Sequence, residues 1–204
     1  MQEQEVIRIL QNQLNYTTKN ISDIKIFINE LLKANKKHNF ISKSTEQLIW
    51  HRHILDSAQL VKFIDFSKSS LSDLGSGAGF PGLILALFNK NKDFHVKLYE
   101  KSPVKRAFLN DMRDILSLKI EIHGNVYENS IDSDYIVSRA FKKLEAIIQV
   151  SREIAKKPHK LIILKGQNAQ EELKKAFIKE KYDYKLENSI TNEDSKIIIV
   201  DFKK

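Results

Sequence analysis

The chain has 204 residues, which is the size of one α/β domain with a small extension rather than of two full domains. Apolar residues make up 42% and charged residues 29%, so we expect a globular chain with a real core rather than a disordered one. The chain has no cysteine, which excludes disulfides, cysteine-ligated zinc, iron–sulfur clusters and a cysteine nucleophile. No apolar run reaches membrane-spanning length and the amino terminus does not read as a secretory signal, so we expect a cytoplasmic protein without a membrane partner.

The formal net charge of +8 favours a polyanionic partner such as nucleic acid. An AT-rich genome or selection for solubility would produce the same lysine-rich composition. Charge alone therefore leaves these two interpretations equal.

The first part of the chain, residues 1–65, is predicted to be helical. Apolar residues recur there at helical spacing and form one stripe, at Ile21, Ile24, Phe27, Ile28, Leu31 and Leu32. A second apolar series between residues 48 and 64 predicts further helices, and the polar segment 35–44 separates the two. We therefore predict an N-terminal helical extension over residues 1–65 and a second domain over residues 66–204.

From about residue 69 the pattern changes to alternating strands and helices. Strands are predicted at 70–75, 95–100, 120–124, 134–140, 159–166, 182–190 and 196–202, and helices at 82–90, 102–117, 143–157 and 170–181. Ser102 is the expected N-cap of its helix and Pro103 the first helical residue. This order predicts a mostly parallel sheet of seven strands with helices on both faces, ending in an antiparallel hairpin at one edge. A parallel sheet closed by a reversed final strand is typical of a Rossmann-like, class I methyltransferase.

The strongest local signal is the loop DLGSGAGFPG at 73–82, between the first predicted strand and helix. Glycine allows positive φ and lets a ligand approach the backbone, and ligands of such sheets bind at the carboxyl ends of the strands. A glycine-rich loop alone also occurs in dinucleotide-binding enzymes. Three details favour S-adenosylmethionine instead: Asp73 suits the cationic methionine part, the glycines stand at Gly75, Gly77 and Gly79, and Glu100 ends the next strand, where a carboxylate binds ribose hydroxyls. The competing interpretations are a turn cap for Asp73 and a solvated strand end for Glu100.

Several further motifs occur in a fixed order around this loop: HRHILDS at 51–57, KSPVKRAFL at 101–109, VSRAF at 137–141 and LKG at 164–166. Together with the loop they closely resemble the ribosomal RNA small subunit methyltransferase G family, also called glucose-inhibited division protein B. The resemblance covers the chain from about residue 25 to the end. It implies a cytoplasmic enzyme, expected here to be a monomer, that uses S-adenosylmethionine to methylate the seven-position nitrogen of one guanine in 16S ribosomal RNA or the small ribosomal subunit.

The resemblance also implies site residues. Cofactor contacts carried over by position are Gly75, Phe80, Val126, Tyr127 and Arg139. Glu100 stands where the family usually has Asp, so the carboxylate is kept. No metal site is expected.

The implied chemistry needs no strong base, because the seven-position nitrogen of guanine already carries an in-plane lone pair. Holding the nitrogen, the methyl carbon and the departing sulfur in line can supply roughly 7–11 kcal/mol. The composition fits this reaction better than two others. Methylation of a cytosine ring carbon needs a cysteine, and methylation of an exocyclic amine commonly uses a Pro-Pro motif, and the chain has neither.

Arg139 and Lys165 are the candidate catalytic residues. Arg139 is expected to bind the cofactor, an RNA phosphate or both, against the alternative of a structural ion pair with Asp73 or Asp134. Lys165 is expected on the substrate side. Arg52, Lys101, Lys105 and Arg106 are the candidate RNA-binding residues. The i, i+3 spacing of His53 and Asp56 is interpreted as a packing pair within a helix.

Two other functions compete with this one. A nicotinamide-dependent oxidoreductase is disfavoured by the glycine spacing and by the lack of an obvious Tyr-x-x-x-Lys dyad. A non-enzymatic RNA-binding assembly factor with a vestigial loop is disfavoured because Asp73, Gly75, Gly77, Glu100 and Arg139 are all intact.

Overall fold

The computed structural model describes residues 1–68, 70–176 and 182–203. Its helical segments, including π-helical (η1) and 3-10 (η2, η3) turns, are α1 (Glu3–Leu14), α2 (Thr18–Asn35), α3 (Lys43–Glu46), η1 (Trp50–Leu55), α4 (Asp56–Ala58), η2 (Gln59–Phe63), α5 (Gly82–Phe88), α6 (Pro103–Ile115), η3 (Val126–Glu128), α7 (Leu144–Ile154) and α8 (Ala169–Ala176). Its strands are β1 (Ser70–Leu74), β2 (His95–Tyr99), β3 (Ile120–His123), β4 (Tyr135–Arg139), β5 (His159–Lys165), β6 (Tyr184–Asn188) and β7 (Lys196–Phe202).

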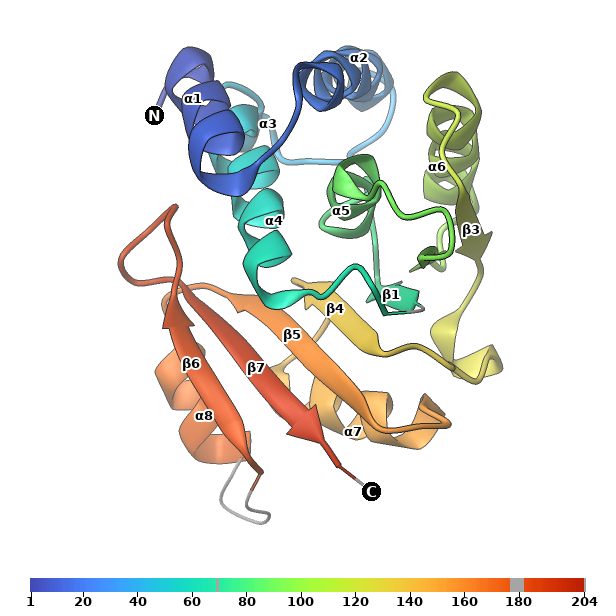
Figure 1. Ribbon diagram of the computed structural model, residues 1–204, viewed down its shortest axis with the longest axis vertical. Coiled ribbons are helices and arrows are strands. Elements are labelled where there is room, and N and C mark those ends of the chain that lie inside the picture. The colour runs from blue at the N-terminus through green and yellow to red at the C-terminus, as the bar shows by residue number, and fades with distance from the viewer. Residues whose placement is uncertain (69, 177–181, 204) are drawn as a thin grey trace.

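The strands form one seven-stranded sheet in the order β3-β2-β1-β4-β5-β7-β6 (Figure 1). Strands β1 to β5 are parallel, and β7 runs antiparallel to both β5 and β6. The predicted class I methyltransferase architecture is thereby confirmed. The final hairpin also forms as predicted, but the last strand inserts beside β5 and leaves β6 at the edge. Strand β6 is exposed along its whole length, whereas β7 carries a buried run, and a buried strand needs neighbours on both sides.

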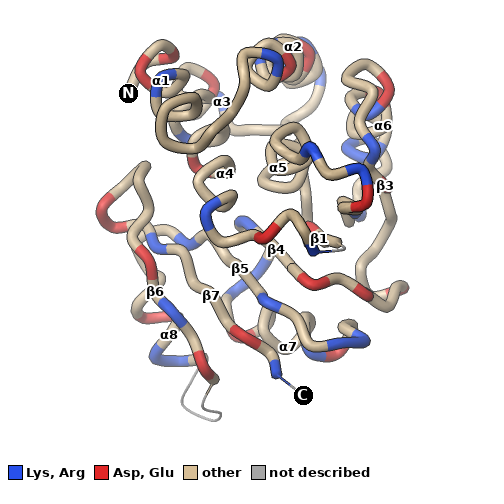
Figure 2. Tube along the Cα trace, in the orientation of Figure 1, with Lys and Arg blue, Asp and Glu red and all other residues tan. Residues whose placement is uncertain are grey.

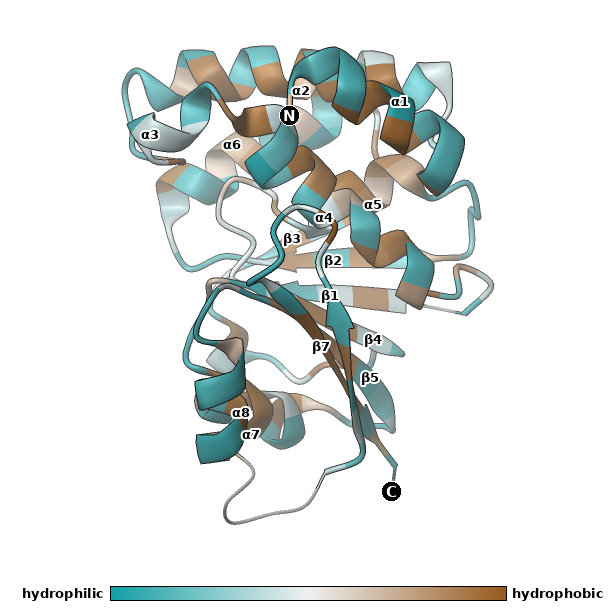
Figure 3. Cartoon of the chain, turned by 90° about the vertical axis from the view of Figure 1, so that its left-hand side faces the viewer, coloured by the Kyte–Doolittle hydropathy of each residue, from teal (hydrophilic) through white to brown (hydrophobic). Residues whose placement is uncertain are grey.

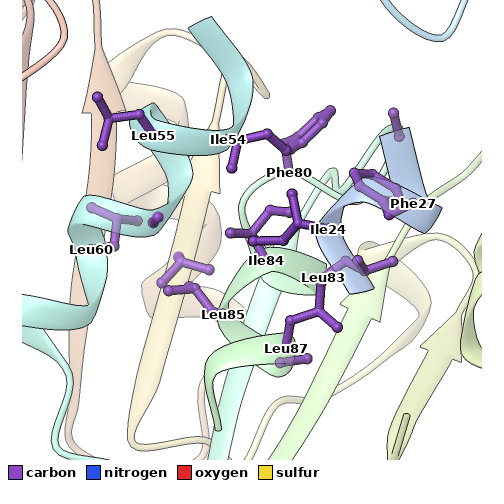
Figure 4. Packing of buried hydrophobic residues seen from close by; sticks show 14 of the residues in the cluster. Ile24, Phe27, Ile54, Leu55, Leu60, Phe80, Leu83, Ile84, Leu85 and Leu87 are labelled. Carbon is purple, nitrogen blue, oxygen red and sulfur yellow. The ribbon is translucent and has the colours of Figure 1, made fainter. Parts of the chain in front are cut away.

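Helices cover both faces of the sheet (Figures 1 and 3). The N-terminal helices share one apolar core with α5, α6 and one face of the sheet, and α7 and α8 pack on the other face in a second core. Figure 4 shows Phe80, from the glycine-rich loop, beside Ile54 and near Phe27. The N-terminal segment therefore packs directly against the loop, and the boundary at residue 65 stays a prediction.

Local sequence explains where the main helices begin. Helix α2 starts with a capping box, in which Thr17 accepts from the Asn20 N–H and Asn20 accepts from the Thr17 N–H. Helix α6 starts as predicted, with Ser102 as N-cap and Pro103 in the first turn. Helix α8 begins at Ala169, and positions 177–181 of its predicted range lie outside the described residues.

One helix departs from its expected geometry. Residues Trp50–Leu55 form a π-helical turn where a regular helix is predicted. Such turns are single-turn widenings of a helix and are frequent at functional sites. The π-turn carries Arg52 and His53, both of which line cavities described below.

Among the described residues, no helix is both long and apolar enough to cross a bilayer.

Candidate active site

The candidate site is a cavity of about 520 Å³ at the carboxyl ends of β1, β2 and β4. The glycine-rich loop, the turn after β2, the segment before η3, the end of β4 and the segment after α2 surround it. Its lining residues include Phe40, Ile41, Thr45, His53, Gly75, Ser76, Gly77, Phe80, Tyr99, Glu100, Lys101, Lys105, Asn125, Val126, Arg139, Phe141 and Lys142. Its volume lies within the roughly 300–1,000 Å³ of small-molecule sites.

The glycine-rich loop turns tightly against the end of β2. Gly75, Gly77 and Gly79 have φ of +74°, +58° and +104°, which is the left-handed region. The N–H groups of Gly75 and Ser76 both donate to the Tyr99 carbonyl, at 2.9 and 3.0 Å. A Cβ on Gly75 would overlap the Phe141 ring, whereas the nearest atom to a Cβ on Gly77 would be 3.9 Å away. The backbone at Gly77 therefore borders open space, as a cradle for a ligand requires.

Glu100 lies directly beside this loop. Its side chain is buried, its Oε2 accepts from the Gly77 N–H at 2.9 Å, and its Oε1 accepts from the Ser102 N–H at 2.8 Å. The loop and this carboxylate therefore lie together on one cavity wall, and their contact with a ligand stays a prediction. Each carboxylate oxygen has two lone pairs, so Glu100 keeps acceptor capacity for hydroxyl groups of a ligand.

Asp73 lies behind the loop and does not line the cavity. It is fully buried, its Oδ2 accepts from the Gly82 N–H at 2.9 Å, and its Oδ1 has no hydrogen-bond partner. Burial raises the pKa of this carboxyl to about 7. This geometry is that of a turn cap, which is the competing interpretation that the sequence offers for Asp73. A direct contact between Asp73 and the cofactor stays a prediction.

Arg139 joins the sheet to the N-terminal helices. Its guanidinium donates to His53 Nδ1 at 2.8 Å and to the Arg52 carbonyl at 3.0 Å, and it pairs with Asp56 at 3.4 Å. It also stacks over the Phe80 ring, 4.8 Å from the ring centroid. An ion pair exists as the alternative predicted, but its carboxylate is Asp56 and not Asp73 or Asp134. Arg139 also lines the cavity, and its contact with the cofactor or an RNA phosphate stays a prediction.

His53 is held in one neutral form. Because Arg139 can only donate, His53 Nδ1 is the acceptor, and Nε2 carries the proton toward Thr45 Oγ1 at 2.9 Å. Burial and the adjacent Arg139 lower the pKa of His53 to about 3. The ring stacks on Phe80 with centroids 5.0 Å apart. The predicted packing pair of His53 with Asp56 is wrong in detail, because each of them binds Arg139.

The predicted basic residues divide between two cavities. Lys101 and Lys105 line the first cavity. Arg52 and Lys165 line a second, neighbouring cavity of about 320 Å³. Arg106 lines neither of them, and its guanidinium donates to the Glu100 and Lys101 carbonyls at 2.9 and 2.7 Å, which holds the turn after β2. Figure 2 shows basic and acidic residues interspersed along most of the described elements.

The remaining predicted contacts fall in different places. Val126 lines the first cavity, whereas its neighbour Tyr127 is 48% exposed and does not. Gly79 also lies outside the lining, where its Cα faces the Leu83 side chain. Lys165 is half-buried, and its ammonium group binds Glu172 at 2.8 Å and the Lys142 carbonyl at 2.7 Å.

Sequence reasoning missed the part of the site that follows α2. Asn35, the last residue of that helix, accepts from the N–H groups of Phe40 and Ile41 at 2.8 and 3.0 Å. This folds the segment back and places both side chains in the cavity wall. The sequence signal for this fold-back was Asn35 itself, a polar residue at the end of the apolar stripe of helix α2. Lys142, which lines the cavity and stands over the Tyr127 ring at 4.8 Å, had no signal of its own.

The described residues contain no group of three or more His, Cys, Asp and Glu side chains suited to a metal.

A family model described as rRNA small subunit methyltransferase G matches residues 20–198. This chain belongs to that family. The match spans the glycine-rich loop and the segments 51–57, 101–109, 137–141 and 164–166, on which the resemblance was based.

Curated relatives agree over almost the whole chain. A ribosomal RNA small subunit methyltransferase G of Pelagibacter ubique is 36% identical and covers 92% of this chain and 90% of its own length. That of Rickettsia felis is 37% identical and covers 88% of this chain and 92% of its own length. Neither competing function, the oxidoreductase or the non-enzymatic assembly factor, is favoured by these relatives.

Solved structures resemble this one in fold. A predicted O-methyltransferase from Agrobacterium tumefaciens superposes with a TM-score of 0.56 at 17% identity, covering 74% of this chain and 81% of that one. The M. jannaschii TYW2 protein, determined in complex with AdoMet, superposes with a TM-score of 0.53 at 18% identity, covering 74% of each chain.

Proposed function

We propose that this chain is an enzyme that transfers a methyl group from S-adenosylmethionine to the seven-position nitrogen of a guanine in 16S ribosomal RNA. Family membership supplies the methyl transfer and the ribosomal RNA of the small subunit. The observation that carries the proposal for these particular residues is the hydrogen bond between the Gly77 N–H and Glu100, which puts a left-handed glycine loop and a carboxylate on one cavity wall.

The residues fit the cofactor. Gly75 and Gly77 offer backbone without a side chain, Glu100 offers acceptors for the ribose hydroxyls, and the apolar Val126 offers a surface for the adenine ring. When bound, S-adenosylmethionine supplies an electrophilic methyl group on a sulfonium.

The protein's own part in the reaction is positioning. The guanine nitrogen attacks with a lone pair that needs no deprotonation, so the site requires no base. His53 could not readily act as one, because Arg139 occupies its Nδ1 and its Nε2 carries the proton. Its neutral ring also adds no positive charge near a sulfonium. Phe80, His53 and Arg139 form a stacked, hydrogen-bonded unit that fixes the cavity wall.

Arg139 and Lys165 retain their proposed roles in catalysis, Arg139 toward the cofactor and Lys165 on the RNA side. Lys101 and Lys105 are proposed to meet RNA phosphates at the cavity, and Arg52 to meet them at the second cavity. For Arg106 an RNA contact would compete with its two backbone hydrogen bonds.

Two measurements test the proposal. Calorimetry should give S-adenosylmethionine a dissociation constant well below millimolar, and NADH should not bind. Labelled cofactor should then transfer its methyl group to small ribosomal subunits that lack the modification, and mass spectrometry should place it on a guanine. Binding without transfer would favour the assembly factor, and NADH binding without S-adenosylmethionine binding would favour the oxidoreductase.

We propose that the enzyme acts on ribosomal subunits in the cytoplasm and that it acts there as a monomer. Light scattering at the concentration of the methylation assay checks the oligomeric state.

A further inference from the structure

The second cavity adjoins the first one across a shared wall. Thr45, His53, Arg139 and Ala140 line both cavities. Transfer between two molecules needs two adjoining spaces, because the reacting atoms must come within about 3–3.5 Å of each other. We propose that the second cavity receives the target guanine nucleotide, turned out of the RNA, and that Asp56 accepts a hydrogen bond from its 2-amino group. This inference rests on the proposed function and adds the substrate pocket to it.

The charge of the second cavity suits a nucleotide. Arg52, Arg139 and Lys165 line it together with the single carboxylate of Asp56. Arg52 is exposed, as a contact to an entering phosphate requires. Lys165 uses two of its three N–H donors, on Glu172 and the Lys142 carbonyl, and one donor is left for the ligand. The volume of about 320 Å³ matches the lower end of small-ligand sites, as a single base with its sugar requires.

Asp56 has spare acceptor capacity. Its Oδ1 accepts from Thr191 Oγ1 and Gln59 Nε2, both at 3.1 Å, whereas its Oδ2 accepts, among the described residues, only the long 3.4 Å bond from Arg139. A carboxylate has about four lone-pair sites, so Oδ2 can accept one more hydrogen bond. Displacing water from Asp56 costs little, because its side chain is only 18% exposed and already largely desolvated.

Asp56 would bind the edge of the base that carries the 2-amino group, and this edge distinguishes guanine from adenine. The 2-amino group donates, whereas adenine carries no donor at that position and offers a ring acceptor beside it. This edge lies on the opposite side of the purine from the seven-position nitrogen. Asp56 lines the second cavity and not the first, so a base held there by its 2-amino group leaves its seven-position nitrogen unbound and available to the methyl group.

Inosine provides the test, because it lacks only the 2-amino group of guanosine. The methylated position is mapped first, and 16S RNA is then assembled by ligation with guanosine or inosine there and reconstituted into small subunits. The full-length protein should methylate the guanosine subunit with a kcat/KM about tenfold or more above that for inosine, the size expected for one hydrogen bond to a charged acceptor. With S-adenosylhomocysteine bound and no turnover, the two affinities should differ in the same direction.

Asp56→Ala should lower activity on both substrates and bring their ratio to about one. Asp56→Asn keeps the side-chain shape with a weaker acceptor. Its ratio of kcat/KM for guanosine to that for inosine should fall between the ratios of the unaltered protein and of Asp56→Ala. Asp201→Ala is the matched control, because this residue pairs in register with Lys160 at the other end of β5; its ratio should equal that of the unaltered protein.

A purely structural Asp56, which only positions Arg139, would reduce both substrates equally and leave the ratio unchanged. That result would overturn the inference, as would equal methylation of guanosine and inosine by the unaltered protein. Failure to methylate either substrate would instead refute the proposed function.

Discussion

The two glycines at the centre of the loop should respond differently to the same added methyl group. Gly75 and Gly77 both have positive φ, which costs an L-residue about 1–2 kcal/mol. At Gly75 the new Cβ would also overlap the Phe141 ring, and such overpacking costs about 1–3 kcal/mol more. At Gly77 the nearest atom would be 3.9 Å away, so no overlap is added.

Gly75→Ala should therefore lower the free energy of unfolding by roughly 2–5 kcal/mol, and Gly77→Ala by roughly 1–2 kcal/mol. Both substitutions restrict the unfolded chain equally, so that effect cancels from their difference. Urea titration followed by fluorescence measures both values by linear extrapolation. In the folded protein, Gly77→Ala should weaken S-adenosylmethionine binding more than Gly75→Ala does, because the Gly77 methyl group would stand at the open cavity wall.

A double variant separates the overlap from the backbone strain. Adding Phe141→Ala to Gly75→Ala removes the overlapping ring, so the two substitutions should couple by about 1–3 kcal/mol. The same second substitution should not couple to Gly77→Ala. Equal destabilisation by the two glycine variants, with no coupling to Phe141, would refute the reasoning.

Three further predictions follow from the site. Arg139→Ala should reduce turnover by orders of magnitude while circular dichroism and cooperative unfolding persist, and near-normal turnover would contradict its role. Glu100→Gln should weaken S-adenosylmethionine binding about tenfold or more in calorimetry, because one amide N–H would face the N–H of Gly77 or Ser102 in place of an acceptor. The raised pKa of Asp73 makes folding favour its protonated form, so its contribution to stability is full below about pH 4 and is lost as the pH rises to about 7. Relative to Asp73→Asn, the free energy of unfolding should fall by up to roughly 4 kcal/mol over that range in urea titrations, and a flat difference would contradict the raised pKa.

The order of strands and helices after residue 69 is readable from the sequence because each element carries its own local signal. The buried strands β5 and β7 contain short apolar runs, and helices such as α6 begin with a serine cap and a proline. The position of β7 between β5 and β6 is not readable in the same way. It depends on which strand is buried on both sides, and that is settled only when the whole sheet assembles.

The same division holds for the site. Gly75, Gly77 and Glu100 were predictable because a turn that needs positive φ and a carboxylate that ends the neighbouring strand are local properties. Arg139 was also identified, but its partner was not, because Asp56 lies 83 residues earlier in the chain. The full burial of Asp73 was likewise not predictable, because burial depends on the packing of distant segments.

The amino-acid sequence by itself determined the order of strands and helices after residue 69, the glycine loop, the carboxylate at the end of β2 and the family. Only the tertiary structure brought the π-turn of the N-terminal helices against the end of β4, where Arg139, His53 and Phe80 stack between two cavities. The physical reason is that local propensities fix dihedral angles within a few residues, whereas contacts between distant segments arise from packing a common apolar core. That core draws the N-terminal helices onto the loop, and with them the residues that separate the two cavities.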